Sequence, residues 1–112
     1  MLRRNVLRKK SDFSAVYNHG KSAADRFVVV FYRKNRLGMN RISFLASKKI
    51  GNSVYRNRAR RLLRESLRLI QQERPLPEGY DIILIARRGI SDQKCQTVMN
   101  SLKRALKRTE IK

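Results

Sequence analysis

Apolar positions along the chain follow two different periods, and the changes between them mark the elements that the sequence predicts. Three segments carry apolar residues at helical spacing, and three carry the β-branched and aromatic residues that strands favour. The predicted order is αββαβα, with a helix over 11–20, strands over 26–33 and 41–49, a helix over 54–74, a strand over 80–88 and a helix from 91.

The strand over 26–33 is apolar on both faces. Alternation places Phe27, Val29 and Phe31 on one face and the residues between them on the other. Its connection to the strand over 41–49 is short and turn-like, so we expect these two strands to form an antiparallel hairpin.

A strand, a long helix and another strand follow one another between residues 41 and 88. A connection of this length suits a crossover between parallel neighbours, which makes the sheet mixed. We therefore predict a small α/β (α+β) two-layer sandwich. At 112 residues the chain fits one domain, residues 1–112, which begins with a basic N-terminal arm over 1–10.

Capping residues set the expected helix boundaries. The candidate N-caps are Ser11 for the first helix, Asn52 or Ser53 for the long helix, and Ser91 followed by Asp92 for the last helix. Gly20 marks the expected end of the first helix, and "PLPEG" after Arg74 marks that of the long helix. The last helix has an apolar stripe of Val98, Leu102, Ala105 and Leu106.

The long helix has one apolar stripe and one basic face. The stripe consists of Ala59, Leu62, Leu63, Ser66 and Ile70. The basic face is offset by two residues and consists of Asn57, Arg60, Arg61, Arg64 and Arg68. From Arg26 to Arg64 there are twelve Lys or Arg and no Asp or Glu, so the alternating charges of an ordinary solvated helix are missing.

The overall charge narrows the class of partner. The chain has 28 Lys and Arg against 8 Asp and Glu, a formal net charge of +20, while its hydrophobic content of 41% is ordinary for a globular domain. Such an excess of positive charge favours a polyanion. The long helix carries mainly arginine, whose planar guanidinium can donate two hydrogen bonds to one phosphate, so we expect RNA or DNA as the partner.

Other classes of function find little support in the sequence. No apolar run has the roughly 18 residues of a membrane span, and no signal peptide is visible, so we expect a cytoplasmic protein. A single Cys and a single His cannot form a zinc cluster, and there is no catalytic triad, P-loop or carboxylate pair beside a His. We interpret Cys95 as a packing residue and expect no catalytic or metal-binding residue in the protein.

The stretch "SKKIGNSVYRNRARRLLRE" resembles the signature of the bacterial ribonuclease P protein component, and "RNR" at 56–58 is its most specific part. The likeness extends over nearly the whole chain, because "RKKSDFSAVYNHG" is similar to the family's N-terminal segment and "YDIILIARRG" to its last strand. The chain departs from the family at Ser43, where relatives often have glycine, and at Leu45, where a small polar residue is frequent.

This resemblance implies an accessory subunit of the ribonucleoprotein endonuclease RNase P. In that family a catalytic RNA, with Mg²⁺, removes the 5′ leader of precursor tRNA by hydrolysis, and the protein supplies no nucleophile. The implied partners are the catalytic RNA and precursor tRNA. The implied fold contains a left-handed βαβ crossover, opposite to the usual handedness.

The resemblance also implies two RNA-binding surfaces. The first contacts the catalytic RNA through the basic helix and the turn before it, with Lys48, Lys49, Arg56, Asn57, Arg58, Arg60, Arg61, Arg64 and Arg68. The second is a cleft that binds the single-stranded leader on aromatic side chains, with Phe13, Tyr17 and Phe31.

Several alternatives stay open on the sequence alone. Helical spacing by itself would make Phe13 and Tyr17 ordinary core contacts. His19 could stabilise the C-terminal end of its helix or contact a phosphate. The composition fits a non-catalytic structural RNA-binding protein, such as a ribosomal protein, equally well. A free-standing nuclease would have to cleave RNA without an RNA subunit.

Overall fold

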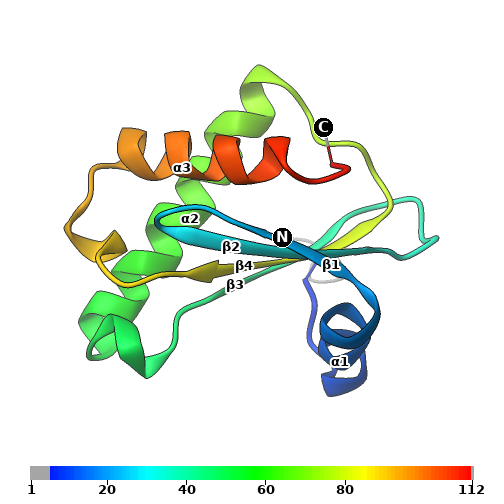
Figure 1. Ribbon diagram of the computed structural model, residues 1–112, viewed down its shortest axis with the longest axis horizontal. Coiled ribbons are helices and arrows are strands. Elements are labelled where there is room, and N and C mark those ends of the chain that lie inside the picture. Colours follow the sequence, from blue (N-terminus) through cyan, green and yellow to red (C-terminus); the bar gives the residue numbers. More distant parts are fainter. Residues whose placement is uncertain (1–5, 112) are drawn as a thin grey trace.

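The structure, a computed structural model, describes residues 6–111, which form three α-helices and one four-stranded sheet. In chain order the elements are α1 (Lys10–His19), β1 (Lys21–Ala24), β2 (Val28–Lys34), β3 (Arg41–Leu45), η2 (Lys48–Ile50), α2 (Ser53–Glu73), β4 (Tyr80–Ala86), η3 (Ile90–Asp92) and α3 (Cys95–Lys107). Helices α2 and α3 lie on one side of the sheet and α1 lies on the other (Figure 1). The predicted α/β fold with a small mixed sheet is confirmed.

The sheet has the strand order β1-β2-β4-β3. Strand β2 pairs antiparallel with β1 and β4, and β3 pairs with β4 in parallel. The parallel pairing across β3–α2–β4 is therefore confirmed, but the predicted hairpin between 26–33 and 41–49 is wrong because β4 lies between the two strands. Strand β4 is buried along almost its whole length, and its central position removes its apolar residues from water on both faces.

The short strand β1 was not predicted. Its sequence, Lys-Ser-Ala-Ala, has no β-branched or aromatic residue and so has little intrinsic strand preference. It pairs with β2 through a tight turn in which the Asp25 N–H donates to the Val28 carbonyl at 2.9 Å. The turn also places Phe27 before the strand. Phe27 therefore packs in the same core cluster as Val28 and Val30, and its predicted position on the face of Phe31 is wrong.

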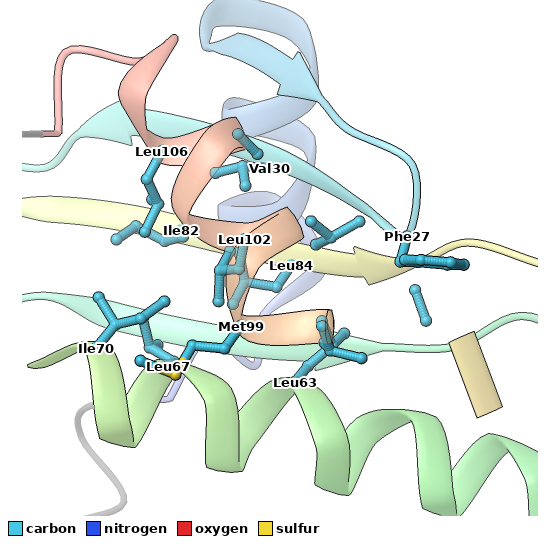
Figure 2. Close-up of a cluster of buried hydrophobic side chains, with 14 of the residues drawn as sticks. Phe27, Val30, Leu63, Leu67, Ile70, Ile82, Leu84, Met99, Leu102 and Leu106 are labelled. Carbon is cyan, nitrogen blue, oxygen red and sulfur yellow. The ribbon is translucent and has the colours of Figure 1, made fainter. Parts of the chain in front are cut away.

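The main core lies between the sheet and the two helices α2 and α3. Figure 2 shows Leu63 of α2 and Leu102 of α3 pointing toward Ile82 and Leu84 of the central strand. Complete burial of a leucine contributes about 1.5–3 kcal/mol relative to exposure. The predicted stripe of α3 is buried throughout, whereas in α2 the predicted Leu62 is only half-buried. The apolar spacing therefore identified the inner faces of both helices.

Helix α2 begins where the sequence predicts. The side-chain oxygen of its N-cap, Asn52, accepts hydrogen bonds from the backbone N–H groups of Val54 and Tyr55 at 3.1 and 3.2 Å. Two of the amides that lack a partner within the helix are thus satisfied by one side chain. The helix ends at Glu73, close to the expected Arg74.

Helix α3 begins later than predicted. The Ser91 hydroxyl donates to the Tyr55 carbonyl of α2 at 2.9 Å, so it is engaged with another helix and does not cap α3. Residues Ile90–Asp92 instead form the separate turn η3, in which Ile90 is completely buried. The helix itself starts at Cys95.

Helix α1 starts at Lys10, so the predicted N-cap Ser11 lies inside it, and it ends at the predicted Gly20. A Cβ atom on Gly20 would lie 2.4 Å from the carbonyl oxygens of both Tyr32 and Val16. Glycine therefore lets the end of α1 approach the backbone of β2 closely. This approach fixes the helix on the outer face of the sheet, which is the face turned away from α2 and α3.

The described end of the predicted basic arm packs on the sheet. Val6 forms a parallel bridge with Ile42 at the edge of β3, and the Leu7 side chain is buried. Residues 1–5, which hold the rest of the charge predicted for an extended arm before Arg8, lie outside the described residues.

Candidate nucleic-acid interface

The basic residues of α2 lie opposite its buried stripe. We call Asn57, Arg60, Arg61, Arg64 and Arg68 the arginine face. All of its members are exposed except Arg60, which is half-buried. Lys48 and Lys49 are exposed on η2, immediately before the helix. The structure therefore brings the predicted catalytic-RNA-binding residues to one helix and the turn before it, and their contact with RNA stays a prediction.

The turn before α2 depends on Gly51. Its φ of 139° lies in a region that side chains other than glycine rarely adopt. This turn places Lys48 and Lys49 at the N-terminal end of α2, where the helix dipole adds to their positive charge. Because Asn52 already accepts from two amides of the first turn, fewer free N–H groups are present there than an uncapped helix would offer.

Arg58 differs from the rest of the RNR motif because it is hydrogen-bonded to a distant part of the chain. Its Nε donates to the Ser91 carbonyl at 2.6 Å, while the Ser91 hydroxyl donates back to the Tyr55 carbonyl. These two hydrogen bonds join the first turns of α2 to η3. Arg58 therefore positions α2 in the fold, and its predicted contact with RNA stays a prediction.

Three arginines of the arginine face differ in their protein partners. Arg68 pairs with Glu65, Nε to Oε1 2.6 Å, and this hydrogen bond raises the pKa of Arg68 and lowers that of Glu65, so both stay charged. The Arg64 guanidinium lies 5.2 Å from the centre of the Phe44 ring, within cation–π range. Within residues 6–111, Arg61 has no acidic group at salt-bridge distance. Its exposed charge is therefore the most available to a phosphate.

The predicted aromatic residues meet on the outer face of the sheet. We define the aromatic face as Phe13, Tyr17, Val29, Phe31, Leu45 and Ile85. Apart from the exposed Tyr17, all of these side chains are half-buried. Beneath α1, the buried side chains of Leu7, Val16 and Ile83 form a small second core against which Phe13 and Phe31 pack. The structure therefore brings Phe13, Tyr17 and Phe31 together at the border between a core cluster and solvent.

Tyr17 has the most open ring of the three aromatic residues. It stands edge-on to Phe31, with ring centroids 5.0 Å apart and planes at 82°, and 42% of the residue is exposed. Partial burial raises the pKa of Tyr17, so its hydroxyl stays protonated at neutral pH and can donate a hydrogen bond. Binding of a base at this ring stays a prediction.

The two remaining candidate residues have simple surroundings. His19 is exposed in the last turn of α1, where a positive charge would interact favourably with the negative end of the helix dipole. Cys95 is partly buried at the start of α3, with its Sγ 3.7 Å from the Ser66 Oγ of α2. This contact agrees with the packing role predicted for the cysteine.

The sequence did not reveal Val29, Leu45 and Ile85 as members of the aromatic face. Strand alternation correctly placed Val29 beside Phe31 on one face of its strand, but gave no reason to join Val29 to the leader-binding residues. Their neighbours depend on strand order, and Ile85 lies beside both Val29 and Leu45 only because β4 separates β2 from β3. Because the predicted hairpin paired β2 with the wrong strand, the sequence could not show that Ile85 and Leu45 extend this surface.

The fold combines a cationic helix with an aromatic surface on the outer face of a small mixed sheet. The arginine face and η2 offer positive charge, and Tyr17 offers a ring on which an unpaired base can stack. None of the helices described between residues 6 and 111 has the length and apolar character needed to cross a membrane. These features define a basic nucleic-acid-binding protein of α/β type.

Comparison with known proteins identifies the family. The family model for ribonuclease P matches residues 1–110. The ribonuclease P protein component of Pelotomaculum thermopropionicum is 49% identical over 107 residues, which cover 96% of this chain and 94% of the relative. That of Clostridioides difficile is 43% identical over 105 residues, covering 94% and 91% of the two chains. The chain belongs to the family of bacterial ribonuclease P protein components.

Solved structures of this family share the fold. The RNase P protein of Staphylococcus aureus matches with a TM-score of 0.83 at 32% identity, covering 96% of both chains. That of Thermotoga maritima matches with a TM-score of 0.80 at 32% identity, covering 94% of this chain and 97% of the other. As a member of the family, the protein is an RNA-binding subunit of an endoribonuclease that processes tRNA, and it works with the RNase P RNA.

Proposed function

We propose that the aromatic face binds the single-stranded 5′ leader of precursor tRNA, while the arginine face and η2 bind the catalytic RNA. The protein would then hold the leader beside the RNA that cleaves it. The observation that carries this proposal is the exposed ring of Tyr17 beside Phe31, at the border of a half-buried apolar surface in a chain of net charge +20.

Base stacking and charge neutralisation both support binding of an unpaired strand at the aromatic face. Stacking of a base on an aromatic ring contributes about 1–3 kcal/mol and tolerates any base. The strand's phosphates also need cations within reach, and Leu45 at the end of β3 lies only three residues before Lys48 of η2. The aromatic face therefore ends next to exposed lysines, which can neutralise a strand that stacks on it.

We further propose that Mg²⁺ acts within the catalytic RNA and that the protein contributes positive charge and position. Metal ions activate water and stabilise the charge that develops at a phosphate under attack. In the described part of the chain, no group of three or more His, Cys, Asp or Glu is placed to hold a metal ion. We also propose that the protein works in the cytoplasm, as expected from the sequence.

The first test is cleavage of a precursor tRNA by a bacterial RNase P RNA at low Mg²⁺, with and without this protein. We expect cleavage at the leader junction only when both components are present, because the protein's cations offset the repulsion between two RNAs. Protein alone should leave the precursor intact. Failure to stimulate any compatible RNase P RNA would contradict the proposed function.

A purely structural RNA-binding role is the second candidate, and the basic surface of α2 would suit it equally. The two candidates differ in whether the assembled enzyme binds precursor tRNA more tightly than mature tRNA, because only the precursor carries a leader. Equal affinities would favour the structural role.

A free-standing nuclease is the third candidate. The RNase P protein of S. aureus has a variant with defective mRNA degradation activity. The protein-alone test should therefore include an unrelated mRNA. Cleavage that persists through purification and disappears on a single substitution in this chain would support a protein nuclease.

A further inference from the structure

The outer face of the sheet changes from apolar to charged along its strands. The side chains that point to this face form three rows in register across β2, β4 and β3: Val29, Ile85 and Leu45; then Phe31, Ile83 and Ser43; then Arg33, Asp81 and Arg41. The first row belongs to the aromatic face, and the middle row lies under Val16 of α1. The charged row therefore lies beyond α1, at the far end of the same surface.

Helix α1 separates the two ends of this surface. Val16 faces the sheet, and helical geometry places Phe13 and Tyr17 on one flank of α1 and Asp12 and Ala15 on the other. The contacts agree with this division, since Tyr17 packs on Phe31 whereas the Asp12 carboxylate meets the charged row. The aromatic face and the charged row thus border opposite flanks of one short helix.

The charged row forms the floor of a hollow of about 520 Å³, which we call the basic hollow. It is lined by Asp12, Ala15, Arg33, Lys34, Asn35, Arg36, Arg41 and Asp81. A second hollow adjoins it across the same Asp12 and Arg41 and is lined in addition by Arg8 and Lys9. Cations from the N-terminal segment, from β2 and from the loop after β2 therefore surround one concave surface.

Both acidic groups in the basic hollow contact Arg41, and the four Lys and Arg residues of its lining outnumber these two carboxylates. Arg41 donates to both carboxylate oxygens of Asp81, at 2.8 and 2.7 Å, and to Asp12 at 3.3 Å. Asn35 also donates to Asp81 at 2.9 Å. Arg33 and Arg36 are exposed, and neither has an acidic partner at salt-bridge distance among the residues described. Their charges are therefore available to an external anion.

We propose that the basic hollow binds phosphates of the precursor leader, upstream of the nucleotides that the aromatic face holds. This inference rests on the proposed function, in which the leader occupies the aromatic face. A strand that leaves that face can cross the outer surface of α1, where Ser11, Ser14 and Asn18 are exposed and uncharged. Beyond the helix it meets Arg33 and Arg36, whose planar guanidinium groups suit phosphate oxygens.

The position of the basic hollow favours the leader over the catalytic RNA. Strand β3 runs from Arg41 at the hollow to η2 and the start of α2, so the hollow and η2 lie at opposite ends of this strand. The aromatic face lies between them on the same outer face. The arginine face, in contrast, belongs to a helix on the other side of the sheet (Figure 1).

The test measures the affinity of the assembled enzyme for precursors with leaders of about 3 and about 12 nucleotides, a span typical of single-strand sites. The variant is Arg33→Ala/Arg36→Ala. We expect about tenfold weaker binding of the long-leader precursor and unchanged binding of the short one. The slope of log affinity against log salt for the long leader should fall by about 1.4, the value for two single-strand phosphate contacts.

Two further variants make this test decisive. Arg74→Ala/Lys107→Ala removes the same charge from exposed residues beside the groove between α2 and α3 and should leave both affinities unchanged. Arg33→Lys/Arg36→Lys should restore most of the affinity for the long leader.

Three results would overturn the proposal. They are no loss for the long leader in a folded variant, an equal loss for both leaders, or weaker binding of the catalytic RNA itself. A wild-type enzyme that binds short-leader precursor no more tightly than mature tRNA would instead contradict the proposed function of the aromatic face.

Discussion

Arg58 and Arg61 lie one turn apart on α2, yet the fold uses them differently. Arg58 joins α2 to η3 through the Ser91 carbonyl, whereas Arg61 is exposed to solvent. Spacing on the helix cannot distinguish the two, because the partner of Arg58 is 33 residues away in the sequence.

We predict that Arg58→Ala lowers the free energy of unfolding by about 1 kcal/mol. The effect is modest because water competes for the hydrogen bond of an exposed arginine and reduces its net contribution to stability. Arg61→Ala should change stability by less than about 0.5 kcal/mol and should weaken binding of the catalytic RNA. Urea unfolding and RNA titration at moderate salt check both. Equal stability of the two variants would remove the positioning role of Arg58.

Asp25 is a second residue whose role depends on distant partners. Its carboxylate accepts hydrogen bonds from Arg104 at 2.9 and 3.1 Å, from Arg108 at 3.1 Å and from Ser101 at 2.7 Å. These bonds, led by that of Arg104, hold the pKa of Asp25 well below its usual range. They attach the turn between β1 and β2 to α3.

The expected stability of Asp25→Asn depends on pH. The ionised Asp25 stabilises the fold at pH values above about 3.9, its ordinary pKa, and this contribution is lost as the pH falls toward the lower pKa of the folded state. The variant should be about 1–2 kcal/mol less stable at pH 7, because both arginines are half-exposed. The difference should shrink below about pH 4. Urea unfolding at several pH values measures it, and a constant difference would contradict the assignment.

At the scale of elements, α1 determines how much of the outer sheet face remains open. Its close approach at Gly20 leaves no room for a side chain. We predict that Gly20→Ala lowers the free energy of unfolding by about 1–3 kcal/mol, because the added methyl meets backbone oxygens that cannot move aside. The displaced helix should also weaken the preference for precursor over mature tRNA. Ser14→Ala, on the exposed side of the same helix, is the control for stability and should leave the free energy of unfolding unchanged.

The aromatic residues on α1 can be separated by their burial. Tyr17→Ala should reduce the preference of the assembled enzyme for precursor tRNA by the value of one stacked base, about 1–3 kcal/mol, with little change in stability. Phe13→Ala should also reduce stability, because its half-buried ring packs on the small core under α1. Affinities for precursor and mature tRNA, with unfolding curves, test this. An unchanged preference in Tyr17→Ala would make Tyr17 a packing residue only.

The elements differ in how far the sequence could predict them. The faces of α2 were predictable because the spacing of Ala59, Leu63 and Ile70 is a local property of one helix. The parallel pairing of β3 with β4 was predictable from the length of the crossover, but the partner of β2 was not, because β4 is the last strand in the chain and still lies between β2 and β3. Its continuous apolar run was the available signal, since only a strand covered on both faces buries such a run. The basic hollow could not be predicted either, because its charged row exists only through this register.

At the scale of the whole molecule, the net charge of +20 has opposite effects on folding and on binding. Repulsion among the cations destabilises the compact state, and salt screens it. We predict that raising NaCl from about 0.05 to about 0.5 M increases the free energy of unfolding by roughly 1 kcal/mol, or about 4–8 °C in Tm. RNA affinity should fall over the same range. Calorimetry and RNA titration across one salt series would check both, and a Tm that falls with salt would contradict the first.

The central position of β4 also determines when the protein can fold during synthesis. Until residue 86 has left the ribosome, β2 and β3 have no strand to join them, and only the β1–β2 hairpin and isolated helices can form. The rows of the outer face likewise come together only after β4 is in place. Nascent chains that stop before β4 should therefore stay unfolded, and the interval before its arrival is the period in which a bound RNA or a chaperone could most influence the yield of folded protein.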